Sequence, residues 1–471
     1  MSPEAALQTI ASSTGWPNDV LGPVSFEGNA DPIIPSIFRV GTAGAAAIAA
    51  SGLAASQLWW LRSGHQQKLA INLRQAAAAM RSGNYLKLNG VPVPEKYNAI
   101  MGTYRTKDRR WAYIHTNFPQ QRAAALTVLG SDENREAVAK AFERWTALEF
   151  ENKLIAAGGA GGAVRSFAEW GAHPQAAAVA ERPLIEIERI GDSPPEALRT
   201  GSRPLSGVRV IDITRLIAGP TCARTLAEHG ADVLKISARH LPDFGFQEFD
   251  VGHGKLSSYL DLREQADNER LHGLVRDADV FLQSYRPGAL ARFGFSPEKL
   301  ASLRPGLICV SLSAFGHTGP WAARRGYDSV VQAMTGMAAR QSEVMNGADA
   351  PPRFNPAAAI DYCAGYLLAA GAMVALQRRA IEGGSWLVRT SLARVGKWMV
   401  DLGEVDRKAA MKVPSEFSDS ELDGWSMTSE GPQGRLRHLK PVIEMSATPA
   451  RWARPAVPLG HHQAEWPPRN G

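Results

Sequence analysis

Apolar and polar residues follow one another in the second half of the chain in an order that predicts alternating strands and helices. Val208–Ile213 is a short β-branched run, and the next segment has a helix start at Pro220 and a stop at Gly230. Ala231–Ser237 then has the composition of a second buried strand. A strand, a helix and a strand in this order form a βαβ unit, which implies a parallel sheet.

The same alternation continues further along the chain. It predicts a helix over Arg263–Asp277, a strand over Asp279–Gln283, a helix over Pro297–Leu303 and a strand over Ile308–Gly316. The segment that begins at Leu205 is therefore expected to fold as a Rossmann-like, doubly wound parallel α/β sheet.

The first half of the chain has a different pattern. Met101–Asn117 predicts a hairpin around a polar turn, and helices are expected from Gln120 to about Ala156. Gly191–Pro204 is rich in Pro, Gly and polar residues, as in an exposed linker. The predicted division is an Ala-rich helical segment (1–80), a small α+β domain (81–190), the linker (191–204), the α/β domain (205–400) and a C-terminal segment (401–471).

A faint internal repeat relates the two halves. The Ala/Gly-rich helix after Thr42 can be laid on the Ala-rich helix after Asp361, an offset of 361 − 42 = 319. The same offset brings Gly64 onto Gly383. Ala-rich sequences align easily, so the repeat by itself is only a suggestion.

Composition narrows the class of protein. The 471 residues are 45% hydrophobic and 21% charged, which is typical of a globular protein of two or three domains. The net charge of +6 is spread along the chain, so we expect an anionic ligand and no nucleic acid. The three cysteines are far apart and form no CxxC pair, which argues against disulfides and a metal site.

We expect a cytoplasmic protein that does not enter a membrane. The N-terminus lacks a basic stretch followed by an apolar core, which argues against a secretory signal. Val40–Leu61 is uncharged and long enough to span a bilayer, but it consists largely of Ala, Gly and Ser. A helix packed inside the protein is the better interpretation of this segment.

Several signatures of common enzyme classes are missing. The turn after the first strand of the α/β domain is TRLIAGP (Thr214–Pro220), without the GxGxxG that binds dinucleotides, so NAD(P) is disfavoured. The sequence also has no GxxxxGK[ST], HExxH or GxSxG motif. The chemistry must therefore come from other loops at the carboxyl ends of the strands.

Four segments resemble the family III CoA-transferases, the group of formyl-CoA, carnitine-CoA and bile-acid CoA-transferases. They are LSGVRVIDITRLIAGPTCARTLAEHGADVLKI from Leu205, the stretch Ala278–Pro320, RRGYDSVVQAMTGMA from Arg324, and the stretch Ala357–Arg379. Their order and number over most of Leu205–Ser391 make the resemblance specific. It implies an enzyme that uses coenzyme A as part of an acyl-CoA substrate, with a small carboxylic acid as acceptor.

The resemblance also implies site residues. The family nucleophile is an aspartate that opens a helix after the GYD segment, and Asp361 occupies that place. A carboxylate at a helix N-terminus is expected to be kept ionised by the dipole and by free N–H groups. The alternative is a purely structural role, in which Asp361 is simply an N-cap. The positions that correspond to CoA contacts in the family are Arg215, Lys255, Ser284, Tyr285 and Arg292.

The order of the segments departs from the family. The small domain comes before the α/β domain, and Gly434–His462 resembles the family's return segment. We interpret the chain as a fusion of two incomplete copies, in which Thr42 stands where Asp361 stands in the other. One nucleophile per chain is therefore expected. Family members form interlocked dimers, which implies a homodimer.

Two other functions remain open. A relative, α-methylacyl-CoA racemase, has a His in the GYD-like motif where this chain has Tyr327, and a phenol is a poor proton acceptor at neutral pH. A racemase-like isomerase is thus the rival enzyme. A non-catalytic CoA-binding homologue is the alternative of a different class.

Overall fold

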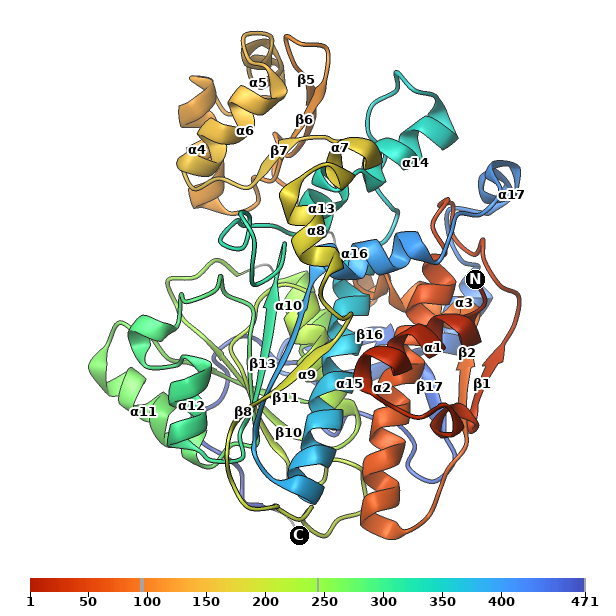
Figure 1. Ribbon diagram of the computed structural model, residues 1–471, viewed down its shortest axis with the longest axis vertical. Coiled ribbons are helices and arrows are strands. Elements are labelled where there is room, and N and C mark those ends of the chain that lie inside the picture. The colour runs from red at the N-terminus through yellow and green to blue at the C-terminus, as the bar shows by residue number, and fades with distance from the viewer. Residues whose placement is uncertain (94–96, 244, 470–471) are drawn as a thin grey trace.

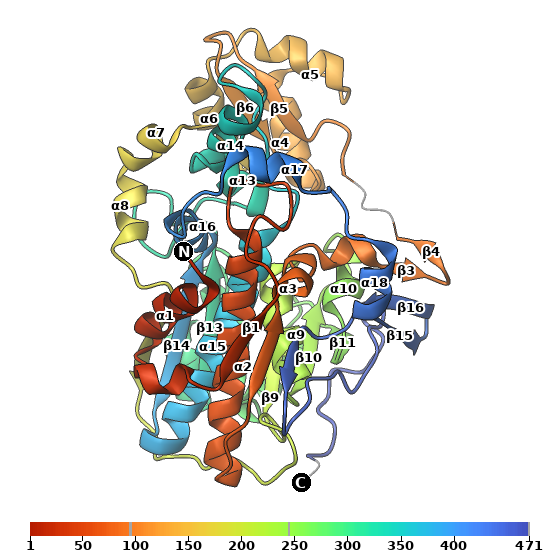
Figure 2. The same ribbon diagram turned by 90° about the vertical axis from the view of Figure 1, so that its right-hand side faces the viewer.

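The computed structural model describes residues 1–93, 97–243 and 245–469. Figure 1 shows a large body with a central sheet and, above it, a smaller lobe of helices and strands. In the view turned by 90° the N-terminal helices lie in front of the sheet (Figure 2). The two halves of the chain therefore share one large body.

The central sheet has seven strands in the order β11-β10-β9-β12-β13-β14-β8. All neighbours pair in parallel except β14 and β8, which are antiparallel. This confirms the predicted parallel α/β fold, with β9 as an interior strand. The strands are β8 (Glu186–Gly191), β9 (Arg209–Asp212), β10 (Asp232–Ser237), β11 (Lys255–Tyr259), β12 (Val280–Gln283), β13 (Ile308–Ser313) and β14 (Ser385–Ser391).

Helices cover both faces of this sheet, which explains why its strands are apolar on both sides. Leu271 and Leu300 pack on one face, and Cys222 and Leu367 belong to the core on the other. The helices around the sheet are α9 (Ala218–Glu228), α10 (Phe246–Val251), α11 (Gln265–Arg276), α12 (Pro297–Leu303), α15 (Ala359–Glu382) and α16 (Leu392–Asp401). Helix α9 begins at Ala218, two residues before the predicted start at Pro220. Proline is tolerated there because the N–H groups of the first turn have no partner in the helix.

Helices α2 (Val40–Ser63) and α15 pack along each other in the middle of the molecule. Of the described residues, α15 alone has the length and apolar composition of a membrane span, and its most apolar stretch is wholly buried in the protein. Helix α2 is buried over most of its length, as predicted for Val40–Leu61. A side chain added at Gly52 of α2 would collide with Ile443, so a glycine there permits the C-terminal segment to pack closely on α2.

The remaining N-terminal elements complete the same body. The other helices are α1 (Pro3–Thr14) and α3 (Leu73–Ala79), with short 3-10 turns η1 (Asn18–Leu21) and η2 (Ser82–Tyr85). Strands β1 (Val24–Glu27) and β2 (Leu69–Asn72) form a small sheet with β17 (Ile443–Met445). A further sheet joins β3 (Lys87–Leu88) and β4 (Val91–Pro92) to β15 (Ser426–Gly431) and β16 (Gly434–Leu439). The C-terminal segment thus ties the N-terminal half to the large body.

The upper lobe is the small α+β domain. The predicted hairpin is present as β5 (Gly102–Arg105) and β6 (Trp111–Ile114), and β7 (Gly161–Ala163) extends it. Its helices are α4 (Pro119–Leu129), α5 (Arg135–Phe142) and α6 (Ala147–Ala156). In its core Tyr104 stacks on Phe142, and Phe142 meets Phe150 edge to face.

The remaining helices lie between the upper lobe and the large body or on the large body. They are α7 (Phe167–Gly171), α8 (Pro174–Ala180), α13 (Asp328–Met334), α14 (Met337–Asn346), α17 (Arg407–Lys412) and α18 (Asp419–Trp425), and η3 (Ala291–Phe293) follows β12. Strand β8 lies at the edge of the central sheet, although the boundary at residue 190 assigned most of it to the small domain. The chain therefore returns to the large body before the linker. Of the predicted C-terminal segment, residues 470 and 471 lie outside the described residues.

The suggested repeat has a counterpart in three dimensions. Helix α2, β2 and α3 follow each other as α15, β14 and α16 do. Gly64 and Gly383 end the two long helices with φ of 73° and 72°. Asn72 and Ser391, again 391 − 72 = 319 residues apart, are the N-caps of α3 and α16, each accepting a backbone N–H three residues on.

Candidate active site

Asp361 lies where two cavities meet. It is the third residue of α15, after the N-cap Ala358, and it lines both a cavity of about 470 Å³ and one of about 430 Å³. The walls that the two cavities share are Phe118, Leu216, Ile217, Tyr327 and Asp361. Asp361 is thus not the N-cap of its helix, and the alternative that it serves only as an N-cap is excluded.

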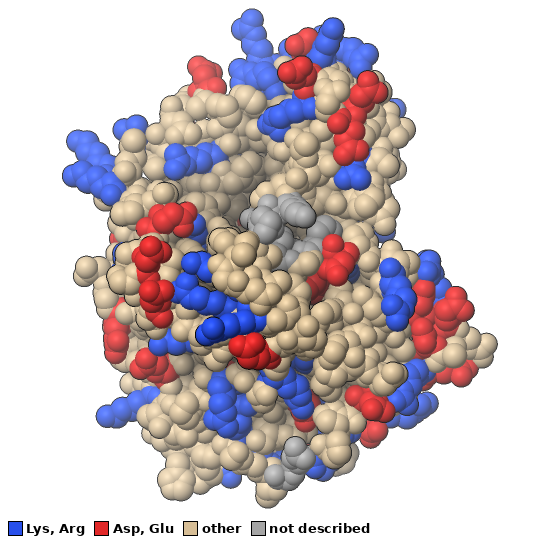
Figure 3. Space-filling view, turned by 180° about the vertical axis from the view of Figure 1, so that it is seen from behind, with Lys and Arg blue, Asp and Glu red and all other residues tan. Residues whose placement is uncertain are grey.

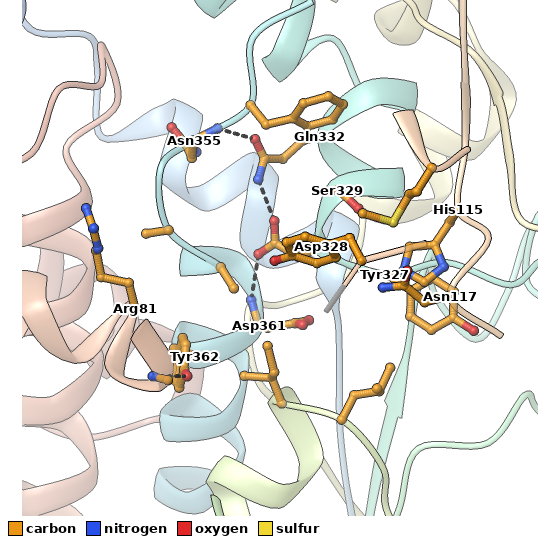
Figure 4. Close-up of a pocket in the computed structure, with 18 of the residues that line it drawn as sticks. Arg81, His115, Asn117, Tyr327, Asp328, Ser329, Gln332, Asn355, Asp361 and Tyr362 are labelled. Carbon is orange, nitrogen blue, oxygen red and sulfur yellow. Dashed lines mark hydrogen bonds between the residues drawn. The ribbon is translucent and has the colours of Figure 1, made fainter. Parts of the chain in front are cut away.

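The start of α15 is held by a different carboxylate, Asp328. Its Oδ2 accepts the backbone N–H groups of Ile360 and Asp361, at 3.0 and 3.1 Å. Gln332 donates its side-chain amide to the other oxygen of Asp328 and accepts the N–H of Asn355 at 2.9 Å. Figure 4 shows this chain of hydrogen bonds, which ends on the backbone beside Asp361.

The carboxyl group of Asp361 has a different environment. Among the described residues, no hydrogen bond reaches its side chain. Burial and the neighbouring Asp328 raise its pKa well above the usual range, and burial raises the pKa of Asp328 to about 6. The prediction that the helix N-terminus keeps Asp361 ionised is therefore wrong, because Asp328 uses the N–H groups that would do so.

The smaller cavity is lined with arginines, and we call it the cation cavity. Its cations are Arg215, Arg286, Arg292, Arg324 and Arg325, and Ser284 and Tyr285 also line it. Asp361 is the one carboxylate among its described lining residues. In Figure 3 the surface is hollowed between the upper lobe and the large body, and Lys and Arg side chains gather below the hollow.

Four of the five predicted CoA contacts lie in the cation cavity: Arg215, Ser284, Tyr285 and Arg292. Sequence reasoning did not single out Arg286, Arg324 or Arg325. The signal was available, since Arg324 and Arg325 directly precede the GYD motif and Arg286 follows Tyr285.

Lys255 lies outside both cavities. Its ammonium group is buried, 2.8 Å from Asp212 and 2.8 Å from the carbonyl of Pro220. Burial alone would raise the pKa of Asp212, but Lys235 and Lys255 lower it to about 2. Lys255 thus ties β11 to β9 and to the start of α9, a position that does not support its predicted contact with CoA.

The larger cavity has both apolar and polar walls, and we call it the mixed cavity. The segment between α3 and the upper lobe supplies Arg81 and Asn84, the upper lobe supplies Tyr113 and His115, and the α/β domain supplies Phe354, among others. Arg81 is bound by Glu416 at 2.7 Å. No pattern in the sequence predicted that the N-terminal half would line the site.

Aromatic rings separate the two cavities. The ring of Tyr327 stacks with those of His115 and Phe118, with centroids 4.1 and 5.3 Å away. The guanidinium of Arg215 lies over Phe118, 5.2 Å from its centroid. Burial raises the pKa of Tyr327 to about 12 and lowers that of His115 to about 4.

The turn after β9 brings a strained residue to the same junction. Leu216 has φ of 68°, in the left-handed region that costs a residue with a side chain about 1 kcal/mol or more. It lines both cavities. Such strain persists where the surrounding fold fixes the loop, as it does here between Arg215 and α9.

Residues 205–424 match the family model described as CoA-transferase family III. This part of the chain belongs to CoA-transferase family III. Both cavities are built largely from residues of this family III domain, which includes Asp361 and all five arginines of the cation cavity.

Relatives of known name agree with this assignment. The chain is 31% identical to "Acetyl-coenzyme A transferase nodX" of Hypoxylon pulicicidum, over 64% of this chain and 54% of that one. It is 28% identical to an "Acyl-CoA transferase" of Gibberella moniliformis, over 98% and 94%. It spans about half the length of several other curated relatives that it matches. A crystal structure of a CAIB/BAIF family protein from Brucella suis aligns with 26% identity, over 50% of this chain and 65% of that one, with a TM-score of 0.38.

Proposed function

We propose that this chain transfers coenzyme A from an acyl-CoA to a carboxylic acid, with Asp361 as the covalent nucleophile. The observation that carries the proposal is the position of Asp361, at the junction of an arginine-lined cavity and a larger mixed cavity. A thioester has the same division, with an anionic nucleotide on one side of the sulfur and an acyl group on the other.

The cation cavity suits the nucleotide part of CoA. Guanidinium groups bind phosphate oxygens through charge-assisted hydrogen bonds, and CoA has a 3′-phosphate and a diphosphate. Tyr285 offers an aromatic face for the adenine, and Arg292 is among the cations available to the 3′-phosphate. The acyl group then extends past Asp361 into the mixed cavity.

The chemistry follows from a carboxylate at the thioester. An oxygen of Asp361 attacks the thioester carbonyl, and the C–S bond then breaks. CoA leaves as a thiolate, and the acyl group stays on Asp361 as a mixed anhydride. The thiolate then attacks the Asp361 carbonyl, which releases the first acid and leaves an aspartyl-CoA thioester. The acceptor carboxylate reverses both steps, so that CoA is transferred and Asp361 is restored.

Two features argue against the rival functions. A racemase needs a base beside the acyl α-carbon, and Tyr327, whose pKa burial raises to about 12, is a poor one at neutral pH. A non-catalytic CoA-binding homologue does not need a carboxylate where the two cavities meet. The cytoplasmic location, the homodimer and the small acceptor acid remain proposals of the same kind.

Trapping tests the proposal directly. The protein is incubated with a panel of acyl-CoAs and then with hydroxylamine, and the peptide that contains Asp361 is weighed by mass spectrometry. We expect an aspartyl hydroxamate at Asp361 that depends on the acyl-CoA. Binding of CoA without this product under any thioester would support the non-catalytic homologue instead.

A further inference from the structure

The hydrogen bonds at the start of α15 leave Asp361 without the donors that a helix N-terminus usually provides. The N–H groups of Ile360 and Asp361 both point to Asp328. The N–H of Tyr362 is used within the helix, by the carbonyl of Ala358. Asp328 itself is fixed by Gln332. The carboxyl group that does the capping and the carboxyl group that faces the cavities are therefore different groups.

The other titratable groups that line the two cavities are mostly cations and phenols, with Asp250 as a further carboxylate in the mixed cavity. His115, Tyr113, Tyr327 and Arg81 face the pair from the mixed cavity, together with the arginines of the cation cavity. On α15 itself the nearest titratable groups are Tyr362, whose hydroxyl donates a hydrogen bond to Asp250, and Cys363. Asp328 is the charge that acts most strongly on Asp361, and two carboxyl groups so close do not ionise together easily.

We propose that Asp328 is the positioning residue of this site. By taking the first amides of α15 it withholds them from Asp361, and it leaves that carboxylate poorly solvated and strongly basic where the thioester arrives. The inference rests on the proposed transferase function, because it gives Asp361 the part of nucleophile. A carboxylate that is harder to ionise is the better nucleophile once it is ionised, as for other nucleophiles whose reactivity rises with basicity.

The chain contains a matched control at the start of α2. There Asp31 accepts the N–H groups of Gly41 and Thr42, one on each carboxylate oxygen, at 3.0 and 2.7 Å. Asp328 accepts the corresponding N–H groups of α15 on a single oxygen. Neither Asp31 nor Thr42 is among the residues that line the two cavities. Asp31 thus caps a long buried helix without serving a nucleophile.

The test compares Asp328→Asn with Asp31→Asn. Asp328→Asn can keep the single oxygen that accepts both helix N–H groups, whereas Asp31→Asn keeps one of the two oxygens that accept one N–H group each. Each variant removes one carboxylate. We expect Asp328→Asn to move the acid limb of kcat down by about one pH unit or more. Its plateau kcat should fall about threefold for each unit moved, because a less basic carboxylate is less nucleophilic. KM for acyl-CoA should change less than twofold, and Asp31→Asn should leave the profile unchanged.

A second variant predicts the opposite shift. Gln332→Met removes the side-chain donor to Asp328, so the pair should hold its proton more tightly and the acid limb should move to higher pH. The inference is overturned if Asp328→Asn leaves the acid limb in place, or if Asp31→Asn moves it equally.

A chemical readout separates this inference from the proposed function. Carbodiimide modifies protonated carboxyl groups, and mass spectrometry of the Asp361 peptide gives the pH at which modification is half complete. We expect this pH to be lower in Asp328→Asn than in wild type, whether or not the protein transfers CoA. An unchanged labelling pH refutes the role of Asp328, and absent hydroxamate with a shifted labelling pH refutes the transferase instead.

Discussion

The two long helices α2 and α15 begin alike and face different surroundings. Each start is capped by an aspartate from a preceding loop or helix, Asp31 in one case and Asp328 in the other. At the start of α2, a side chain at Gly41 would meet Ile33 at 2.5 Å, and Thr42 is fully buried. At the start of α15, Asp361 faces two cavities. The capped helix start is thus a structural element common to both. Its function depends on which residues surround the third residue of the helix, Thr42 in α2 and Asp361 in α15.

The surroundings of Asp361 come from distant parts of the chain. Phe118 arrives from the small domain, Leu216 from the turn after β9, and Tyr327 from the residue before α13. The start of α2 is covered instead by its own neighbouring loop, around Ile33. The comparison therefore predicts that a substitution at the start of α15 affects catalysis, whereas one at the start of α2 affects stability.

The largest effect is expected at Asp361 itself. Asp361→Ala should lower CoA transfer by several orders of magnitude, because it removes the proposed nucleophile. The fold should persist, since Asp361 caps nothing and Ala is a good helix former. Turnover is measured with the acyl-CoA that gives the hydroxamate, and thermal melting and CoA binding serve as controls. Retention of more than a few per cent of the wild-type turnover contradicts this assignment.

The second effect is one of stability. Thr42→Asp puts at the start of α2 the residue found at the start of α15, but buried beside Asp31 and without a cavity. An unpaired buried carboxylate should destabilise the protein by about 3 kcal/mol. It should give no second hydroxamate. Urea unfolding measures the first outcome and peptide mass spectrometry the second, and Thr42→Val controls for the changed shape. A labelled Asp at position 42 would mean that the two helix starts are chemically equivalent.

The third effect concerns the cation cavity. Arg292→Ala should weaken CoA binding about tenfold, as expected for one lost charge-assisted contact. Dephospho-CoA should lose less if Arg292 meets the 3′-phosphate. Calorimetric titration of both ligands measures this difference, and Arg263→Ala, on the surface against Asp261, is the control. Equal losses for both ligands assign Arg292 to another part of the nucleotide.

Much of the large domain was predictable from its sequence, because its strands are short apolar runs separated by helices. The start of α12 at Pro297 agrees with the expectation, and β9 and β12 agree within two residues. Lys255 was harder to place. A lysine at the beginning of a strand has the composition of a surface charge, yet its partner Asp212 lies 43 residues away and both are buried.

The site was predictable only where neighbours in sequence are neighbours in space. Arg215, Ser284 and Tyr285 lie in motifs of the family and were found. The bond from Asp361 to Asp328 spans 33 residues, and Phe118 comes from another domain. No local pattern announces such contacts, because they depend on how the domains pack. For the same reason the sequence could not predict that Asp328 accepts the N–H groups at the start of α15, which leaves none of them for the Asp361 side chain.

The smallest expected effect is the loss of folding stability that the buried Asp361 carboxyl group causes when it ionises. Its folded-state pKa is raised, so the folded protein binds this proton more tightly than the unfolded chain does. Stability is therefore highest below the unfolded pKa, near 4, and falls as the pH rises toward the raised folded pKa. Asp361→Asn removes this titration. Its melting temperature should equal that of wild type at pH 4 and exceed it by about 2 °C or more at pH 8. This is the shift expected from a stability difference of roughly 1 kcal/mol. Differential scanning calorimetry at both pH values measures the difference, and Asp192→Asn, whose side chain is 97% exposed, should show none. A variant that melts below wild type at pH 8 would mean that Asp361 stabilises its helix as Asp31 and Asp328 do, and the distinction between a capping carboxylate and a reactive one would fail.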